Sequence, residues 1–306
     1  MNILSSQPII TIKHAKKQFD QVSVLKDISM SVQKGEIYTL LGENGAGKTT
    51  LIKMMTTLLQ QDSGEIIIAG LSVKDQPDKV RELISLNAQE TTVDMFFSGY
   101  ENLQLIARLR GVKDIKVEIE QLTQRLRLKE FIDRRVAEYS GGMRRRLDIA
   151  MSLVGDPEIV FLDEPTTGVD PKNRLEIWRI IREIRDSGKT IFLTTQYLDE
   201  ADRLSDHISF LHQGEIVLTG TPAELKKNTS KEIKITLETA QQEQGKALLE
   251  EAGIQFTDEE GLIISEADQQ QALELFVAHE LTILALKAEE ISLETTFLMI
   301  TKEQNK

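Results

Sequence analysis

The most informative part of the chain is Gly42-Glu43-Asn44-Gly45-Ala46-Gly47-Lys48-Thr49. It matches the pattern G-x-x-x-x-G-K-[ST], in which glycines let the backbone wrap around an anion with its N–H groups turned inward. An apolar strand is predicted before it at Glu36–Leu41, and an apolar-faced helix after it at Lys48–Leu59. The stretch therefore has the flanks that a phosphate-binding loop needs, at a helix N-terminus whose dipole favours an anion.

Two side chains of this loop have distinct roles toward a nucleotide. Lys48 is expected to reach the β- and γ-phosphates, and Thr49 to place its hydroxyl on Mg²⁺. A chance glycine-rich turn is the alternative, and average residue usage produces such a match in about one chain in a hundred of this length. The nucleotide-binding set predicted from the loop is Gly42, Asn44, Gly45, Ala46, Gly47, Lys48, Thr49 and Thr50.

Outward from the loop, residues 1 to about 220 alternate between predicted strands and helices, which indicates an α/β fold. Val160–Leu162 and Ile191–Leu193 are continuous apolar runs, as expected of central strands that are buried on both faces. Between about residues 98 and 155 helical periodicity takes over, so a helical subdomain is expected inside the α/β core. The predicted strands are Ile9–Ile12, Ile28–Val32, Glu36–Leu41, Gly64–Ala69, Leu83–Asn87, Ile159–Leu162 and Thr190–Thr194, with a last hairpin at His207–His212 and Glu215–Thr219.

A second, smaller domain is predicted at residues 229–306, after a nucleotide-binding domain at residues 1–228. Its segments follow one another in the order β-α-β-β-α-β, which indicates a ferredoxin-like α+β domain. The expected elements are strands at Lys231–Leu237, Ile254–Thr257, Leu262–Ser265 and Thr282–Leu286, with helices at Gln241–Ala252 and Gln269–His279.

Charge and cysteine content exclude several kinds of function. The 306 residues carry a formal net charge of −12, whereas a protein that grips nucleic acid usually presents a basic surface. Because the chain has no cysteine, disulfides, thiolate nucleophiles and cysteine-bound metals are excluded. No apolar run approaches the roughly 18 residues of a membrane span, and Met1–His14 lacks the layout of a signal peptide. Any membrane role is therefore expected to depend on a partner.

Three further motifs indicate which class of nucleotide-binding protein this is. They are Tyr139-Ser140-Gly141-Gly142-Met143, Ile159-Val160-Phe161-Leu162-Asp163-Glu164 and Gly168-Val169-Asp170. In order and spacing they resemble the signature, Walker B and D-loop motifs of the ABC ATPase family, and the resemblance covers residues 1 to about 225. Tyr139–Ala150, Leu193–Asp202 and the C-terminal extension are most similar to drug-resistance exporter ATPases of the daunorubicin type.

The resemblance implies roles for five more positions. Asp163 is expected to hold Mg²⁺ through water, and Glu164 to polarise the attacking water. Gln89 resembles the Q-loop glutamine, which senses Mg²⁺ and water while facing the membrane subunit. Phe19 stands where the family stacks an aromatic ring on adenine, and Asp170 is the D-loop aspartate. The structural alternatives are a strand-end cap for the two carboxylates, a surface position for Gln89 and core burial for Phe19.

Ser140, Gly141 and Gly142 open a predicted helix, Met143–Leu153, so their N–H groups form a second anion site. In the ABC family this site completes the ATP pocket of the opposite protomer; a serine N-cap followed by glycines is the structural alternative. The resemblance therefore implies a dimer, of identical chains or with a similar ATPase, that closes around two ATP molecules. It also implies a separate multi-span permease of the ABC-2 type, with this chain bound at the cytoplasmic face of the cell membrane.

Two positions depart from the family pattern. Met143 replaces the usual signature glutamine, so contacts to ATP there should depend on Ser140 and on backbone N–H groups. Gln196 stands at the position of the switch histidine, and its amide can donate to the γ-phosphate but cannot carry an imidazolium charge. Glutamine there is itself a feature of the drug-exporter group. The row Arg144-Arg145-Arg146 on the signature helix is interpreted as a salt-bridged, solvated face.

The sequence thus predicts an ATP-binding, ATP-hydrolysing ABC transporter subunit that powers export of a drug, antibiotic or lipid-like molecule. Its predicted catalytic residues are Glu164, Gln196 and Lys48, and its predicted Mg²⁺ ligands are Thr49, Gln89 and Asp163. Two alternatives stay open, namely a soluble ABC ATPase that acts on the ribosome or on nucleic acid, and a regulatory module that binds ATP without hydrolysing it. The single phosphate-binding loop and the acidic net charge favour the transporter, with no nucleic acid as partner.

Overall fold

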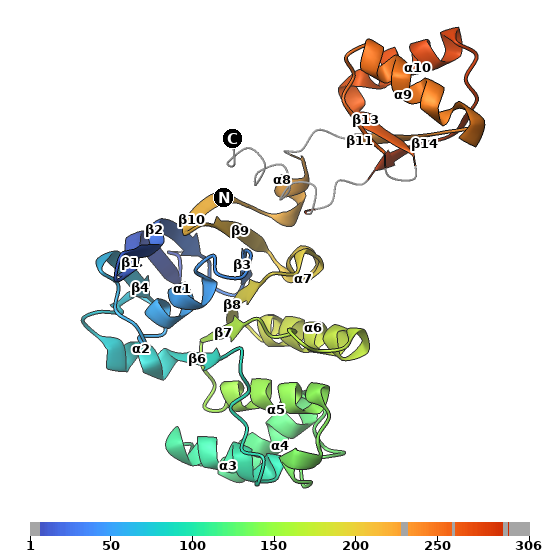
Figure 1. The fold of residues 1–306 in the computed structure, drawn as a ribbon. Coiled ribbons are helices and arrows are strands. Elements are labelled where there is room, and N and C mark those ends of the chain that lie inside the picture. Colours follow the sequence, from blue (N-terminus) through green and yellow to red (C-terminus); the bar gives the residue numbers. More distant parts are fainter. Residues whose placement is uncertain (1–6, 228–231, 259–260, 290–292, 294–306) are drawn as a thin grey trace, which may run out of the picture. The chain divides into compact units, whose positions relative to one another are not determined.

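The computed structural model describes residues 7–227, 232–258, 261–289 and 293. The chain divides into two compact units, Met1–Thr221 and Pro222–Lys306 (Figure 1). The domain boundary predicted between residues 228 and 229 lies outside the described residues, and so it stays a prediction.

A six-stranded sheet forms the centre of the first unit (Figure 1). Its order is β10-β9-β3-β8-β7-β6, in which β10 runs antiparallel to β9 and the other strands are parallel. Strands β3, β7 and β8 are buried along their whole length, as their continuous apolar runs predict. The strands are β3 (Ile37–Leu41), β6 (Ile84–Asn87), β7 (Ile159–Asp163), β8 (Thr190–Thr195), β9 (His207–His212) and β10 (Glu215–Gly220).

The register of the parallel strands decides which loops meet. Leu41 of β3 pairs with Thr195 of β8, and Thr194 of β8 pairs with Asp163 of β7. Because the carboxyl ends of parallel strands lie at one edge of a sheet, the segments after β3, β6, β7 and β8 gather there. Each of these segments carries residues that the sequence assigns to the nucleotide site.

A smaller antiparallel sheet, in the order β2-β1-β4-β5, shares one apolar core with α1 and the central sheet. Strands β1 and β2 extend beyond their predicted bounds and form a hairpin in which Phe19 pairs with Val22. One face of this hairpin carries polar residues, so apolar runs alone underestimate its length. The strands are β1 (Ile10–Phe19), β2 (Val22–Val32), β4 (Ser63–Ile68) and β5 (Leu71–Ser72).

Helix α1 (Lys48–Met55) is shorter than the predicted Lys48–Leu59. Thr57 has a left-handed φ of +65°, which ends the helix, and Leu58 is 64 % exposed instead of lying on a buried face. The apolar spacing continues past this break in the backbone, so periodicity alone places the helix end too late. The other helices of the α/β part are α2 (Pro77–Leu83), α6 (Pro171–Asp186) and α7 (Leu198–Leu204).

Three helices form the predicted helical insertion, α3 (Gly99–Leu109), α4 (Ile115–Arg125) and α5 (Gly141–Leu153), with a 3₁₀ turn at Val136–Glu138 (Figure 1). Helix α3 begins with a capping box, in which the Ser98 hydroxyl accepts from the Glu101 N–H and the Glu101 carboxylate accepts from the Ser98 N–H. The apolar faces of these helices share one core with α6 and the inner strands. No helix of the described residues combines the length and the apolar character needed to span a bilayer.

The second unit contains a four-stranded antiparallel sheet in the order β12-β13-β11-β14. Helices α9 and α10 pack on it through a core that includes Leu249, Phe276 and Ile235. After a first short helix, its strands and helices follow the predicted order β-α-β-β-α-β. The elements are α8 (Pro222–Lys227), β11 (Glu232–Leu237), α9 (Gln242–Glu251), β12 (Phe256–Asp258), β13 (Leu262–Ser265), α10 (Gln269–Ala278) and β14 (Ile283–Glu289), with 3₁₀ turns at Thr239–Gln241 and Glu266–Asp268.

Glu200, on α7, is a carboxyl enclosed by the core of the first unit. Its side chain is fully buried, and Oε1 accepts hydrogen bonds from Thr166 Oγ1 and Trp178 Nε1, both at 2.8 Å. Burial raises the pKa of this carboxyl, and the hydrogen bonds offset only part of that effect. Glu200 thereby joins α7 to α6 and to the segment after β7.

We expect Glu200 to make the protein less stable as the pH rises. Its native pKa lies above the unfolded value of 4.5, so between these two values the native state keeps a proton that the unfolded state has released. The glutamine side chain of the Glu200→Gln variant is neutral at every pH, so the variant should lose this dependence of stability on pH. The free energy of unfolding in urea, measured from about pH 5 to 8, should therefore decline less steeply in the variant. Equal slopes would show that Glu200 is ionised in the native protein.

Candidate active site

The loop between β3 and α1 has the backbone geometry of an anion cradle. Gly45 and Gly47 have φ values of +84° and +111°, and a Cβ added at Gly47 would lie 2.7 Å from Leu25 Cδ2. Within the described residues no side chain caps α1, so the amides of its first turn stay available to an anion. Of the other predicted loop residues, Asn44 is exposed, Gly42 and Ala46 are buried, and Thr49 and Thr50 are half-buried.

Lys48 folds back over this loop. Its Nζ donates to Gly42 O at 2.7 Å and to Glu43 O at 3.0 Å, and lies 3.1 Å from Glu164 Oε1. Both charged side chains are buried, with exposed fractions of 4 % for Lys48 and 6 % for Glu164. Because a buried charge needs partners, this contact ties the loop to the segment after β7.

Two threonine hydroxyls share the Asp163 carboxylate at the end of β7. Thr49 Oγ1 donates to Oδ2 at 2.9 Å, and Thr194 Oγ1 donates to Oδ1 at 2.5 Å. Asp163 and Thr49 therefore present neighbouring oxygen atoms, which are the ligands that Mg²⁺ prefers. The donor set fits the metal that the sequence predicts here.

Glu164 follows in a backbone conformation that is costly for a residue with a side chain. Its φ is +49°, in the left-handed region, and its N–H donates to both Thr194 O and Thr194 Oγ1 at 3.1 Å. Thr167 Oγ1 donates to Glu164 Oε2 at 3.0 Å. Neither threonine is among the site residues predicted from the sequence. A hydroxyl at the end of an apolar strand is the signal that could have pointed to Thr194, whereas Thr167 has none.

Gln196 and Gln89 follow the parallel strands β8 and β6, which lie on either side of β7, at the same edge of the sheet. Gln196 comes directly after β8 and is half-buried, and Thr195 Oγ1 accepts from the Tyr197 N–H beside it at 3.0 Å. Gln89 lies two residues after β6 and is exposed. The structure thus places Gln196 and Gln89 on segments that flank the buried carboxylates.

Phe19 lies at the end of the β1–β2 hairpin. Its ring is 45 % exposed, with Lys17 Nζ 5.4 Å from the ring centroid, and is therefore not part of the core. The hairpin runs beside the phosphate-binding loop, because Gly47 lies against Leu25 of β2. An exposed aromatic face in this place suits stacking on a base.

The signature tip, which is formed by residues 140–142, packs against the start of α6. Ser140 caps α5, with its Oγ accepting from the Met143 N–H at 3.3 Å, and both Ser140 and Gly141 are exposed. A Cβ added at Gly142 would lie 2.4 Å from Asn173 Cγ, and the Asn173 side chain donates to Asp170 Oδ2 at 2.6 Å. The signature tip and the D-loop therefore form one joined surface. Met143 packs against the apolar core, whereas the glutamine that is usual at this position of the family is polar.

The prediction of a solvated face for Arg144–Arg146 is wrong for the middle residue. Arg145 is 4 % exposed, and its Nε donates to Pro165 O at 2.6 Å. Arg144 and Arg146 are partly exposed. Successive residues of an α-helix point about 100° apart, so three in a row do not share one face.

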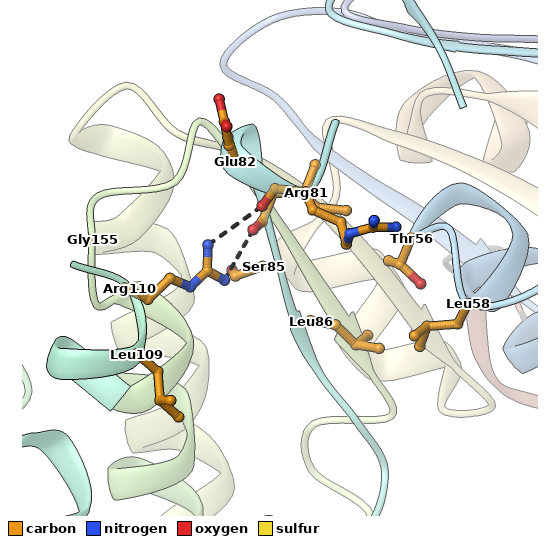
Figure 2. A pocket seen from close by; sticks show the side chains of 10 residues that line it. Thr56, Leu58, Arg81, Glu82, Ser85, Leu86, Leu109, Arg110 and Gly155 are labelled. Atoms are coloured by element: carbon orange, nitrogen blue, oxygen red, sulfur yellow. Dashed lines mark hydrogen bonds between the residues drawn. The ribbon is translucent and has the colours of Figure 1, made fainter. Parts of the chain in front are cut away.

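A groove of about 560 Å³ lies between the α/β part and the helical part of the first unit (Figure 2). Arg110, the residue after α3, reaches across it, donating to Ile84 O at 3.1 Å and to Arg81 O at 3.5 Å. Leu58 and Leu109 are 64 % and 75 % exposed at its sides. The full lining is Thr56, Leu58, Arg81, Glu82, Ile84, Ser85, Leu86, Leu109, Arg110 and Gly155.

The phosphate-binding loop, the two carboxylates after β7 and the helical insertion with its glycine tip define a nucleotide hydrolase of the ABC type. Residues 25–167 match the sequence model of the ABC transporter family. The chain is 38 % identical to the daunorubicin resistance ATP-binding protein DrrA3 of Streptomyces coeruleorubidus, over 97 % of each chain. It therefore belongs to the ABC transporter family, in the group of daunorubicin-resistance ATP-binding proteins, and it binds and hydrolyses ATP.

Two other known proteins agree with this assignment. The chain is 41 % identical to the daunorubicin/doxorubicin resistance ATP-binding protein DrrA of Streptomyces peucetius, over 78 % of this chain and 74 % of that protein. Among solved structures, cbiO1 of Clostridium perfringens, described as part of the ABC transporter complex cbiONQ, is similar with a TM-score of 0.67. It is 28 % identical and the match covers 72 % of this chain and 90 % of that one. The predicted P-loop α/β fold and the ABC transporter function are confirmed, and the ribosomal and regulatory alternatives receive no support.

Glu164→Gln should lower the rate of ATP hydrolysis by about 10²- to 10⁴-fold, the usual contribution of a positioned base. The amide keeps the shape of the side chain but cannot take a proton, so ATP binding should survive. Steady-state phosphate release and equilibrium binding of a fluorescent ATP analogue separate the two effects. Turnover comparable to that of the wild type would remove Glu164 from the role of base.

Thr194→Val should lower kcat by about 10-fold, the scale of one hydrogen bond to a charged group. The variant removes the hydroxyl that contacts both Asp163 and the Glu164 N–H but keeps the branched shape of the side chain. Thr194→Ser keeps the hydroxyl and is the matched control, for which kcat should stay near that of the wild type. If both variants hydrolyse ATP at the same rate, the hydroxyl has no part in positioning the carboxylates.

Proposed function

We propose that this chain drives the export of a drug, antibiotic or lipid-like molecule through a separate multi-span permease of the ABC-2 type, at the cytoplasmic face of the cell membrane. The similar proteins are named for resistance to daunorubicin and doxorubicin, and these names support export. In this arrangement residues 1–228 form the ATPase domain and residues 229–306 an accessory domain. The observation that carries the proposal is the leucine-lined groove at β6, the strand that leads to Gln89 (Figure 2).

ATP is proposed to bind with its phosphates in the loop Gly42–Thr49 and its adenine against Phe19. Phosphate oxygens then compete for Lys48 Nζ with Glu164 Oε1, which lies 3.1 Å from it. This competition frees the Glu164 carboxylate to accept a proton. Mg²⁺, for which Thr49, Asp163 and Gln89 are the proposed ligands, supplies neutralisation of the phosphate charge when it is bound.

Hydrolysis is proposed to depend on two side chains at the edge of the sheet. Glu164 accepts a proton from water as the water oxygen attacks the γ-phosphorus, and the bond from that phosphorus to the bridging oxygen breaks, which leaves ADP and phosphate. The Gln196 amide donates to a γ-phosphate oxygen. The hydrogen bond from Thr167 keeps the Glu164 carboxylate oriented during this step.

Two such ATPase domains, in a homodimer or in a heterodimer with a similar ATPase, are proposed to close around two ATP molecules. Ser140 and Gly141 are exposed at the N-terminus of α5, where amides and the helix dipole suit the phosphates held by the other protomer. Asp170 joins this surface through Asn173. The signature tip and the D-loop would therefore approach the second protomer together.

The groove suits a helix from the permease. Leu58 and Leu109 leave apolar surface uncovered, and the lining carries two arginines, Arg81 and Arg110, against one acidic residue, Glu82. Phe96, a few residues after Gln89, is 86 % exposed. A short amphipathic helix with apolar and acidic residues would bury the leucines and complement the arginines.

A charge placed in the groove tests this function. In vesicles that contain the ATPase and its permease, Leu109→Glu should remove most of the permease-dependent increase in ATP hydrolysis and of doxorubicin transport, because the carboxylate cannot be buried against an apolar helix. Val117→Glu on α4 is the matched control, since Val117 is 54 % exposed and lies outside the groove lining. It should retain both activities. Full stimulation by the permease in Leu109→Glu would exclude docking at this groove.

A further inference from the structure

Of the three consecutive arginines at residues 144–146, Arg145 is buried and the other two are partly exposed. Arg145 and Asp148, one helical turn apart on α5, form an ion pair at 3.2 Å whose side chains are 5 % and 2 % exposed. Burial lowers the pKa of Arg145, while the Asp148 charge opposes that effect. A charge pair kept inside the protein needs a full set of partners, and those partners come from two functional segments.

On one side, Arg145 contacts the backbone around the catalytic carboxylate. Its Nε donates to Pro165 O at 2.6 Å, and its Nη2 lies 3.4 Å from Asp163 O. These two carbonyls flank Glu164, whose φ of +49° is the left-handed conformation that needs support from its surroundings. The guanidinium therefore contacts the chain on both sides of the residue proposed as the base.

On the other side, the pair holds both ends of the segment that carries Gln89. Arg145 Nη1 donates to Ala88 O at 3.0 Å, and Asp148 Oδ2 accepts from Asn87 Nδ2 at 2.8 Å. Asp148 Oδ1 accepts from the N–H of Thr92 at 3.2 Å and from its hydroxyl at 3.1 Å. A movement of residues 87–92 thus reaches the same guanidinium that contacts Asp163 and Pro165.

The Asp148 end of this network opens on the groove. A second cavity, of about 290 Å³, is lined by Asn87, Thr92 and Asp148, and it shares Leu109 and Arg110 with the larger groove of Figure 2. Asn87 Oδ1 and Ser85 Oγ are buried there without a hydrogen-bond partner among the described residues. An occupant of the groove therefore comes within reach of the residues that Asp148 holds.

We propose that Arg145 and Asp148 are positioning residues that couple residues 87–92, the Q-loop segment, to Glu164. A helix bound in the groove then alters the placement of the Glu164 carboxylate. The proposal rests on the proposed docking of the permease in that groove. The planar guanidinium is essential to it, because one rigid group donates to carbonyls of both segments in fixed directions. A lysine ammonium keeps the charge but not this geometry.

The test compares Arg145→Lys with Arg146→Lys in the complex with the permease. Arg146 is the neighbouring arginine, and its contacts are to Arg127 O and the Phe131 ring. Arg145→Lys should lower kcat of the isolated chain at least about 10-fold, leave KM for ATP within about twofold, and lose most of the stimulation by the permease. Arg146→Lys should match the wild type in all three measurements. An Arg145→Lys protein with wild-type kcat and stimulation overturns the proposal.

A loss of stability is separated from a loss of positioning by two further measurements. Thermal unfolding and the fraction of ATP-binding sites correct kcat for unfolded protein, and a wild-type kcat per folded chain would mean that Arg145 only stabilises the fold. Thr92→Val removes the hydroxyl that donates to Asp148 at an exposed position, and it should reduce stimulation by the permease. Thr92→Ser should restore stimulation, and equal stimulation in the two variants would count against the coupling route.

Failure of the proposed function gives a different pattern. If the permease does not dock in the groove, Leu109→Glu and Arg145→Lys both keep full stimulation, while kcat of the isolated Arg145→Lys protein still reports whether the guanidinium positions Glu164. If docking is correct and the coupling is not, Leu109→Glu loses stimulation and Arg145→Lys keeps it.

Discussion

The ammonium group of Lys48 and the carboxylate of Glu164 are both buried and lie 3.1 Å apart. The side chains at the carboxyl edge of the central sheet are arranged around this contact. Neither charge is stable in the interior alone, so each requires close partners of fixed geometry. For Lys48 these are carbonyls of the phosphate-binding loop, and for Glu164 they include the hydroxyl of Thr167. The same pair that stabilises the loop is the pair that a triphosphate would separate, which would link ATP binding to release of the proposed base.

The parallel sheet makes this contact possible. Strands β3, β8 and β7 are neighbours, and their register brings the ends of all three to one edge. Thr194 then donates to Asp163 and accepts from the Glu164 N–H, so that one hydroxyl orders two successive residues. The left-handed conformation of Glu164 persists because hydrogen bonds from several segments support it.

Helix α5 connects this edge to the rest of the first unit. Its N-terminal tip carries Ser140 and joins the start of α6, while Arg145 and Asp148 lie between the Q-loop segment and the backbone at Glu164. One rigid helix thus carries part of the surface proposed for the second protomer, lines the cavity beside the groove proposed for the permease, and contacts the backbone on both sides of the proposed base. Such an arrangement allows a small shift at one place to be felt at the others, because packed interiors transmit displacement rather than absorb it.

The class of fold, the ABC family and the residues of the phosphate-binding loop could be predicted from the amino-acid sequence, because they depend on local patterns of glycine, charge and apolar spacing around residues 42–49 and 159–164. Four features emerge from the folded chain alone: α1 ends at Met55, Met143 packs inward, Arg145 is buried while its neighbours are partly exposed, and Thr194 bonds both the Asp163 carboxylate and the Glu164 N–H. These features arise from contacts between segments far apart in the chain. Local periodicity carries no record of which carbonyl or hydroxyl will lie opposite a given side chain, and that pairing is fixed by the strand register and helix packing of the folded unit.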